Sequence, residues 1–407
     1  MALEIRPITD DEIEQAEFIT AYSFSSPDRR DLAKRVEQAK RFYPNDWSLA
    51  SFEDGEMTAF LRVVPFAMRI NGRALGFGAV GPVVSSPEHR RKGHVGQLLR
   101  RAVADMRERG QVLSGLHTPH PTLYRRYGWE IASTDRIYTF APKEIELMAQ
   151  PSERGRFRML KPDDWALADR VYRRYSATRS GPLHRGEVWW REAVFAASQP
   201  TPADVALWEN GRGEAEGYIV YQQPAAPDRG PDDPRFSVRE LVALTRDGYL
   251  NLILYILRHD LPPKTTWVAP PDDPFLSLVA DATKLNVVEQ YDLLLRICDV
   301  EAALRMRPQA LAGDQVALTL KITDSSAAWN EGTWRIEAGD EQTTVEKTSV
   351  EADLSLSATT LAPLFNGFLS PTAAAHAGLI AARDEDALAR ADAFFATPSP
   401  PHCADGF

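Results

Sequence analysis

Cysteine is scarce in this sequence, and long apolar runs are missing. The 407 residues include two cysteines, Cys298 and Cys403, too few for a disulfide framework and compatible with a reducing compartment. No uninterrupted apolar stretch approaches the ~20 residues that a membrane-spanning helix needs. The N-terminus is acidic early and lacks the apolar core of a secretory signal. These absences predict a cytoplasmic protein with no membrane span.

An excess of basic residues is also missing, because the formal net charge is −10. A nucleic-acid-binding surface needs clustered positive charge for phosphate contacts, so we expect no nucleic-acid partner. The histidines show no metal-ligand spacing, and the Gly-x-Ser-x-Gly signature of a serine nucleophile is absent. The sequence therefore predicts neither a metal site nor a serine hydrolase.

The length exceeds what one hydrophobic core usually organises, and the patterns along the chain divide it into three units. Residues 1–150 show antiparallel strands and then a β–α–β order, with residues 131–140 expected to form one strand. Residues 151–300 repeat a strand–loop–helix–strand order, with a helix expected over 159–176 and an exposed loop at 223–234. Residues 301–407 alternate as strands, continue in Ala- and Leu-rich helices and end in a Pro-rich extended tail. The predicted fold class is mixed α/β (α+β).

The most informative stretch is residues 83–99, VVSSPEHRRKGHVGQLL. A strand ends, a basic turn follows, and an amphipathic helix begins with Leu98 and Leu99 on its apolar stripe. Free N–H groups at a helix N-terminus bind a pyrophosphate well, and Gly93 lets the ligand approach the backbone. The spacing alone supports phosphate binding and a solvated, helix-capping turn about equally. The corresponding loop at 245–248 carries one arginine and a repelling aspartate, which predicts a degenerate second copy.

These residues resemble a known family. His89-Arg90-Arg91-Lys92-Gly93 resembles the acetyl-CoA loop of GNAT acetyltransferases, although Val95 replaces the second small residue of the usual Arg-x-x-Gly-x-Gly/Ala pattern. It is closer to the His-Arg-Arg-Arg-Gly pattern of the Eis-type (enhanced intracellular survival) branch. Residues 116–129 are similar to an Eis stretch that ends in Tyr-Gly-Arg-Phe-Gly-Tyr, and the last unit is similar to the family's sterol-carrier domain.

The resemblance implies a domain plan and an assembly. Residues 1–150 would be a catalytic GNAT domain, 151–300 a degenerate GNAT-like domain, and 301–407 a sterol-carrier-protein-like domain whose tail reaches the active site. Eis-like proteins form hexamers, so the resemblance also implies a homo-oligomer.

The resemblance further implies an N-acetyltransferase that uses acetyl-CoA as co-substrate and no metal. The acceptor would be a primary amine of a polyamine-like or aminoglycoside-like small molecule, or of lysine. Tyr124 would be the general acid, the C-terminal carboxylate of Phe407 the general base, and His117 and Asp28 acceptor contacts, while Tyr127 would be a packing residue. The implied cofactor contacts are Val83, Val84, Ser85, Arg90, Arg91, Lys92, Gly93, His94, Val95, Gly96, Pro119 and His120.

Two other classes of function stay open. In a binding module, the last unit carries a lipid and the GNAT fold senses CoA without turnover. In a scaffold protein, all three units serve only as interaction surfaces. Amine-dependent release of the CoA thiol separates an enzyme from the first alternative, and failure to bind acetyl-CoA favours the second. Individually, Tyr124 can also be a core aromatic with a satisfied hydroxyl, and His117 a structural histidine.

Overall fold

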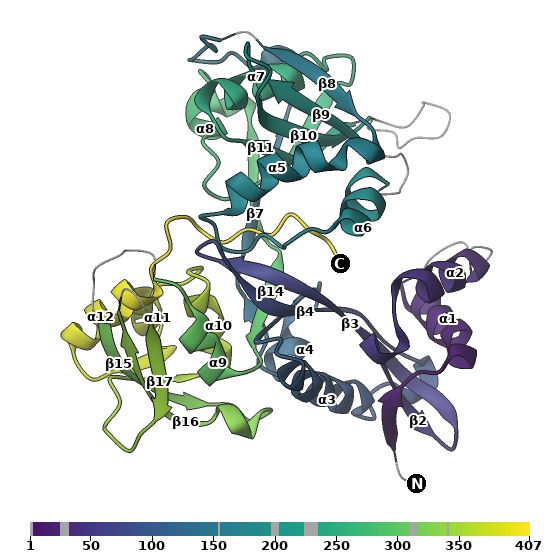
Figure 1. The fold of residues 1–407 in the computed structure, drawn as a ribbon, viewed down its shortest axis with the longest axis vertical. Coiled ribbons are helices and arrows are strands. Elements are labelled where there is room, and N and C mark those ends of the chain that lie inside the picture. The colour runs from purple at the N-terminus through teal and green to yellow at the C-terminus, as the bar shows by residue number, and fades with distance from the viewer. Residues whose placement is uncertain are drawn as a thin grey trace.

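The computed structural model describes residues 3–24, 32–153, 155–196, 203–223, 235–309, 316–339 and 342–407. Its strands form three sheets, which Figure 1 shows as three bodies. The C-terminal tail runs from the third body to the centre of the molecule, where the chain ends. None of the helices in the described ranges is both long and apolar enough to traverse a lipid bilayer.

The first sheet has the strand order β1-β2-β3-β4-β5-β14-β6. Its long β3–β4 hairpin turns at Asn71 and Gly72, which both have positive φ. Adjacent strand residues point to opposite faces: Phe60 packs with helix α1, and Leu61 packs with helix α3. The elements of this body are β1 (Glu4–Pro7), α1 (Ile13–Ser23), α2 (Leu32–Phe42), β2 (Ser48–Glu53), β3 (Glu56–Ile70), β4 (Arg73–Ser85), α3 (His94–Glu108), β5 (Leu113–His117), α4 (Pro121–Arg125) and β6 (Glu130–Ile131), with β14 (Leu293–Ile297) added.

The second sheet has the order β13-β7-β12-β11-β10-β9-β8. Helices α5 and α7 cover its opposite faces, because Leu207 packs with α5 and its neighbour Trp208 with α7. The helix predicted over 159–176 is corrected: Met159 and Leu160 end strand β8, and α5 begins at Trp165. The elements are β7 (Thr134–Phe140), β8 (Arg156–Leu160), α5 (Trp165–Ser176), α6 (Glu187–Trp189), β9 (Asp204–Glu209), β10 (Ala215–Gln222), β11 (Arg235–Ala243), α7 (Arg246–Leu257), β12 (Lys264–Ala269), α8 (Phe275–Leu278) and β13 (Asn286–Tyr291).

These two sheets exchange strands. Strand β14, late in the second unit, lies between β5 and β6 of the first sheet, while β7 lies between β12 and β13 of the second. The single strand expected over 131–140 is therefore wrong. Ala132 and Ser133 instead hydrogen-bond to Leu293 on β14, which ends β6 before β7 enters the other sheet. The boundaries at 150 and 300 stay predictions for the chain, but the sheets do not divide there. Most of the loop predicted at 223–234 lies outside the described residues.

The third sheet has the order β17-β16-β15-β18-β19 and shares a core with the first body. The buried Arg296 of β14 donates to Asp324 of the third unit at 2.8 Å. The tail after Phe395 forms neither helix nor strand, as its prolines predict. The elements are α9 (Val300–Met306), β15 (Val316–Thr323), β16 (Gly332–Ala338), β17 (Thr343–Lys347), β18 (Leu354–Ser357), α10 (Ala358–Phe365), α11 (Pro371–His376), β19 (Ile380–Ala382) and α12 (Glu385–Phe395).

Candidate active site

A cleft of about 1460 Å³ lies in the first body and reaches the C-terminal tail. It brings together segments that are far apart in the sequence: the end of β4, the start of α3, the region around α4 and the end of the chain. The predicted site residues that line it are Val83, Val84, Ser85, Arg90, Arg91, Val95, His117, Pro119, His120, Tyr124 and Phe407. Asp28 lies outside the described residues.

The end of strand β4 is open on one side. Its parallel pairing with β5 covers only residues 77–79, although β4 continues to Ser85. On its other side, Val83 still pairs with Leu61 of β3. Backbone groups of Val83 to Ser85 that face β5 are therefore available to an extended ligand, which can hydrogen-bond there as an added strand would.

The β4–α3 loop, residues 86–93, has the backbone of an anion site. Arg91 and Gly93 adopt positive φ angles of 64° and 86°. Alternating conformations of this kind direct successive N–H groups into one concavity. Helix α3 follows Gly93 without any side-chain cap, so its first N–H groups are free for a ligand.

Three of the predicted cofactor contacts are engaged with other parts of the protein. Lys92 Nζ lies 3.6 Å from a carboxylate oxygen of Glu53, and the buried His94 places Nε2 3.2 Å from the other oxygen. A Cβ added at Gly96 would lie 2.0 Å from the hydroxyl of Tyr127, which also agrees with a packing role for that tyrosine. These contacts fix the shape of the β4–α3 loop.

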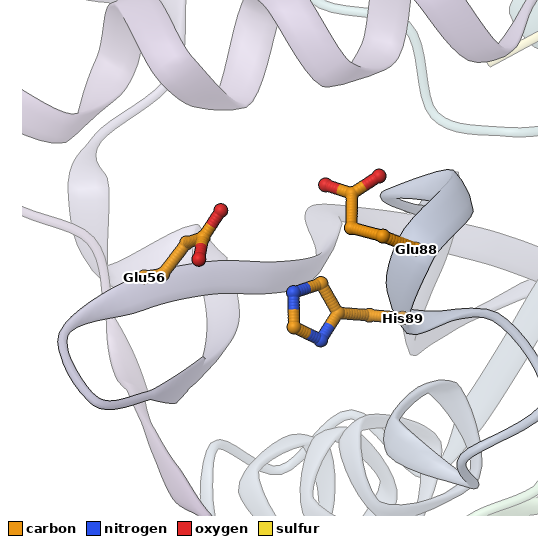
Figure 2. A group of neighbouring side chains, drawn as sticks. All are labelled: Glu56, Glu88 and His89. Carbon is orange, nitrogen blue, oxygen red and sulfur yellow. The ribbon is translucent and has the colours of Figure 1, made fainter.

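A group of charged side chains adjoins the same loop. Figure 2 shows Glu56 on β3 and Glu88 and His89 on the turn after β4, with one ligand atom of each within 4.8 Å of the others. Both glutamates are exposed, and His89 Nδ1 already lies 3.3 Å from Glu53 and 3.2 Å from the Lys92 ammonium. The neighbouring lysine opposes a second cation by charge repulsion, so we assign no metal to this group.

Tyr124 lies on α4 with its ring buried and its side chain in the wall of the cleft. Its ring packs edge-to-face with Trp129, with centroids 6.4 Å apart. Burial raises the pKa of Tyr124 to about 12, so the phenol stays protonated at neutral pH. Among the described residues its hydroxyl has no hydrogen-bond partner, which differs from the satisfied hydroxyl of a core tyrosine.

The end of the chain lies inside the cleft. The ring of Phe407 contacts those of His117, Phe77 and Phe66, with centroids 4.8, 5.8 and 6.3 Å away. A Cβ built on Gly81 would lie 3.3 Å from the Phe407 carboxyl oxygen, so only glycine leaves ordinary room there. The carboxylate of Phe407 is thereby placed beside β4, in the cleft that Tyr124 also lines.

His117 links the tail to Asp292 through hydrogen bonds of its two ring nitrogens. Its Nδ1 lies 2.9 Å from the Asp292 carboxylate, and its Nε2 lies 3.1 Å from the Asp405 carbonyl oxygen. Burial lowers the pKa of His117, but the hydrogen bond and charge of Asp292 outweigh this and raise it above its ordinary value. A carboxylate and a carbonyl oxygen both accept hydrogen bonds, so this arrangement favours the form of His117 in which both ring nitrogens carry protons.

The strongest anchor of the tail was not among the sequence predictions. Arg185, with its side chain 1% exposed, donates to Asp405 at 2.8 Å and to Glu240 at 2.6 Å. Trp189 adds a hydrogen bond to the same Asp405 oxygen at 2.7 Å. Burial alone would lower the pKa of Arg185, but the two carboxylates raise it well above its ordinary range. Residues of the second unit thus hold the tail in the cleft of the first.

The second unit has no equivalent anion site at the start of its helix. The Thr245 side chain caps α7 by accepting from Gly248 N at 3.1 Å. The Asp247 carboxylate accepts from the backbone N–H groups of Ser152 and Glu153, at 3.0 and 3.1 Å. A side-chain cap and a negative charge therefore stand where the first unit has free N–H groups.

Comparisons with known proteins agree with this architecture. Family models match residues 4–132 as an Acetyltransferase (GNAT) domain, 181–297 as another Acetyltransferase (GNAT) domain, and 300–404 as a Sterol carrier protein domain. The chain is 26% identical to an uncharacterized N-acetyltransferase of Streptomyces avermitilis, over 100% of this chain and 99% of the relative. It is 25% identical to N-acetyltransferase Eis of Mycobacterium tuberculosis, over 80% and 79% of the two chains.

Solved structures share the whole fold. A GCN5-related N-acetyltransferase from Anabaena variabilis superposes with a TM-score of 0.87 at 20% identity, over 100% of both chains. Eis1 from Mycobacterium abscessus gives a TM-score of 0.82 at 23% identity, over 99% of this chain and 100% of the other. The predicted fold class, two GNAT domains followed by a sterol carrier domain, is confirmed.

The fold and the matched domains define an acetyltransferase, and the GNAT fold implies that acetyl-CoA is used. The chain belongs to the Eis-like N-acetyltransferases of the GNAT family.

Acetyl-CoA should occupy one site per chain, because α3 of the first unit begins without a side-chain cap, whereas the corresponding helix α7 of the second unit is capped by Thr245. Calorimetric titration should give a stoichiometry of one, and Gly93→Val should weaken binding by straining the loop and adding a side chain in the concavity. Gly213→Val is the matched control, since both glycines have positive φ and open space around an added Cβ. Two equivalent sites, or unchanged affinity in a folded Gly93→Val protein, would contradict this.

Asp405→Ala should release the tail from the cleft. It removes two charge-assisted hydrogen bonds, which are each worth about 1.5–3 kcal/mol, while Arg185 keeps Glu240. We expect carboxypeptidase to remove Phe407 faster and amine-dependent turnover to fall at least about tenfold. Asp386→Ala, on the exposed side of α12, is the control. Unchanged protease resistance would show that other contacts hold the tail.

Proposed function

We propose that this protein transfers the acetyl group of acetyl-CoA to a primary amine of a polyamine-like or aminoglycoside-like small molecule, or of lysine. One observation carries the proposal: Tyr124, the end of β4, the β4–α3 loop and the carboxylate of Phe407 all line a single cleft. In this proposal the cleft holds the cofactor, the proton donor and the proton acceptor together.

The residues present fit acetyl-CoA. The free backbone edge of Val83, Val84 and Ser85 would bind the pantetheine arm as an added strand. Arg90, Arg91 and the backbone of residues 92–96 would bind the pyrophosphate. Pro119 and His120, exposed before α4, would lie beside the cofactor. The thioester would then be placed between Tyr124 and the tail.

Transfer then needs two proton movements. The acceptor amine must be neutral to attack, and the carboxylate of Phe407, directly or through water, accepts the proton that the nitrogen loses as it becomes an amide. The nitrogen attacks the thioester carbonyl, so that a C–N bond forms and the C–S bond breaks. Tyr124 donates its proton to the departing thiolate, and both groups return to their starting states by exchange with water. The net reaction is amine plus acetyl-CoA to amide plus CoA thiol.

The same features weigh against a binding module or a scaffold. A sensor of CoA needs the β4–α3 loop but has no use for a tyrosine hydroxyl that has no hydrogen-bond partner among the described residues and lies in the same cleft as the chain's carboxylate. His117, proposed from the sequence as an acceptor contact, lines the cleft but uses both ring nitrogens within the protein, so we propose that it positions the tail. From the resemblance we also propose a hexameric, cytoplasmic protein, and two buried free cysteines suit that compartment.

Tyr124→Phe keeps the buried ring but removes the proton donor. The turnover number should fall by about 100-fold or more, the usual contribution of general acid catalysis, with little change in acetyl-CoA affinity. Thiol-release kinetics with calorimetry on the same preparations measure both. Tyr127→Phe is the control, because that residue packs against Gly96. If Tyr127→Phe were the slow variant and Tyr124→Phe the normal one, the assignment would be reversed.

Activity should also depend on the chain ending at Phe407. Deletion of Phe407, or a C-terminal extension, moves the carboxylate away from Gly81 and should lower turnover by about 100-fold or more, as for a lost general base. Acetyl-CoA binding should survive, and an N-terminal tag should be harmless. An extended protein with normal turnover would exclude the terminal carboxylate as the base.

A further inference from the structure

The cleft lining carries more positive than negative side chains. Among the described residues that line it are four arginines, Arg35, Arg62, Arg90 and Arg91, and one acidic residue, Glu17. Arg90 and Arg91 belong to the β4–α3 loop and its proposed pyrophosphate site. Arg35 and Arg62 come from α2 and β3, and neither has a role in the cofactor site proposed above.

Arg62 is held firmly in the wall of the cleft. The residue is 6% exposed, its Nη2 donates to Glu17 at 3.0 Å, and its Nε donates to Ser48 Oγ at 3.2 Å. Its guanidinium lies over the ring of Tyr43, 4.3 Å from the centroid. In the described part of the chain, Nη1 has no hydrogen-bond partner, although the side chain borders the cleft.

Glu17 is shared between two arginines. Its second oxygen lies 3.5 Å from Nε of Arg35, and that nitrogen is buried without a hydrogen bond. Among the described residues, two guanidinium groups therefore face this one carboxylate. Arg62 is buried against Glu17, whereas the side chain of Arg35 is 34% exposed, so an anion in the cleft can pair with the two arginines at little cost in desolvation.

This cluster lies close to the proposed base. Strand β3 pairs Leu61 with Val83 and Val63 with Val80, so Arg62 lies opposite Gly81 and Pro82. The carboxyl oxygen of Phe407 lies against Gly81. Arg62 and Phe407 line the same cleft of about 1460 Å³, so we expect one small molecule bound there to reach both.

We propose that the acceptor is a zwitterion, a primary amine that also carries a carboxylate or a phosphate, and that Arg62 with Arg35 binds its anionic group. The amine would then face the carboxylate of Phe407. This inference rests on the proposed acetyltransfer and narrows its acceptor class. It disfavours polycations, because the one acidic side chain of the described lining is already engaged by two arginines.

Matched amines test the proposal directly. Lysine is compared with cadaverine, which lacks its carboxylate, and O-phosphoethanolamine with ethanolamine, which lacks its phosphate, with kanamycin as a polycation. In thiol-release assays, the anionic member of at least one pair should have the higher kcat/KM by about 10- to 100-fold, as expected for hydrogen bonds to a charged group. The favoured pair identifies carboxylate or phosphate as the anion.

Variants then test whether Arg62 and Arg35 cause the preference for the anionic amine. Arg62→Gln should abolish the advantage of the anionic amine while acetyl-CoA affinity stays unchanged, and Arg35→Gln should reduce it. The double variant Glu17→Gln, Arg62→Gln removes one charge of each sign and covers the case in which Arg62→Gln alone fails to fold. Arg101→Gln, on the exposed side of α3, is the control.

The outcomes separate this inference from the proposed function. Acetylation of both members of each pair at similar rates, or a preference for cadaverine or kanamycin, would overturn the zwitterion proposal and leave acetyltransfer intact. In that case Arg62 serves only in its ion pair with Glu17. Absence of thiol release with every amine would overturn the proposed function, and calorimetry of the same amines with CoA-loaded protein would then decide whether Arg62 binds their anionic group.

Discussion

Arg185 is a fully buried cation, and a buried cation requires anions close by. The chain supplies two from distant places: Glu240 on β11 of the second sheet and Asp405 near the end of the third unit. The arginine therefore links the second unit to the tail. His117 of the first unit contacts the same residue, because its Nε2 lies within hydrogen-bond distance of the Asp405 carbonyl oxygen. Through this chain of contacts, the position of Phe407 in the cleft depends on one guanidinium.

The cleft that we propose as the active site is consequently not a property of the first GNAT domain alone. The second unit contributes Trp189, whose ring meets Phe66 edge-on with centroids 4.9 Å apart. It also contributes β14, which separates β5 from β6 and carries Arg296 to the third unit. The third unit contributes the tail that Figure 1 shows crossing to the centre. A copy that has lost its anion site thus keeps a structural role in the cleft of the first unit.

Local features of this fold could be predicted from the sequence, and long-range pairings could not. The Asn71-Gly72 turn, helix α3 and the β4–α3 loop follow from nearby residues, because turn chemistry and periodicity act over a few positions. Periodicity identifies a strand but not its partner, so the exchange of β7 and β14 gave no signal. Arg185 and Asp405 lie 220 residues apart, and Glu17 and Arg62 lie 45 apart, with no spacing rule to connect either pair. The proposed role of Phe407 as general base came from the family resemblance. The contacts that hold the tail in the cleft could be found only in the structure.

We propose that the terminal carboxylate of Phe407 acts in the reaction, and the sharpest test is to convert it to a carboxamide. A semisynthetic protein with a C-terminal amide keeps every side chain and the length of the tail, but it loses the negative charge and the proton acceptor. We expect normal acetyl-CoA binding by calorimetry and a fall of about 100-fold or more in amine-dependent thiol release, the scale of a lost general base. Turnover by the amide at the rate of the unmodified protein would contradict it.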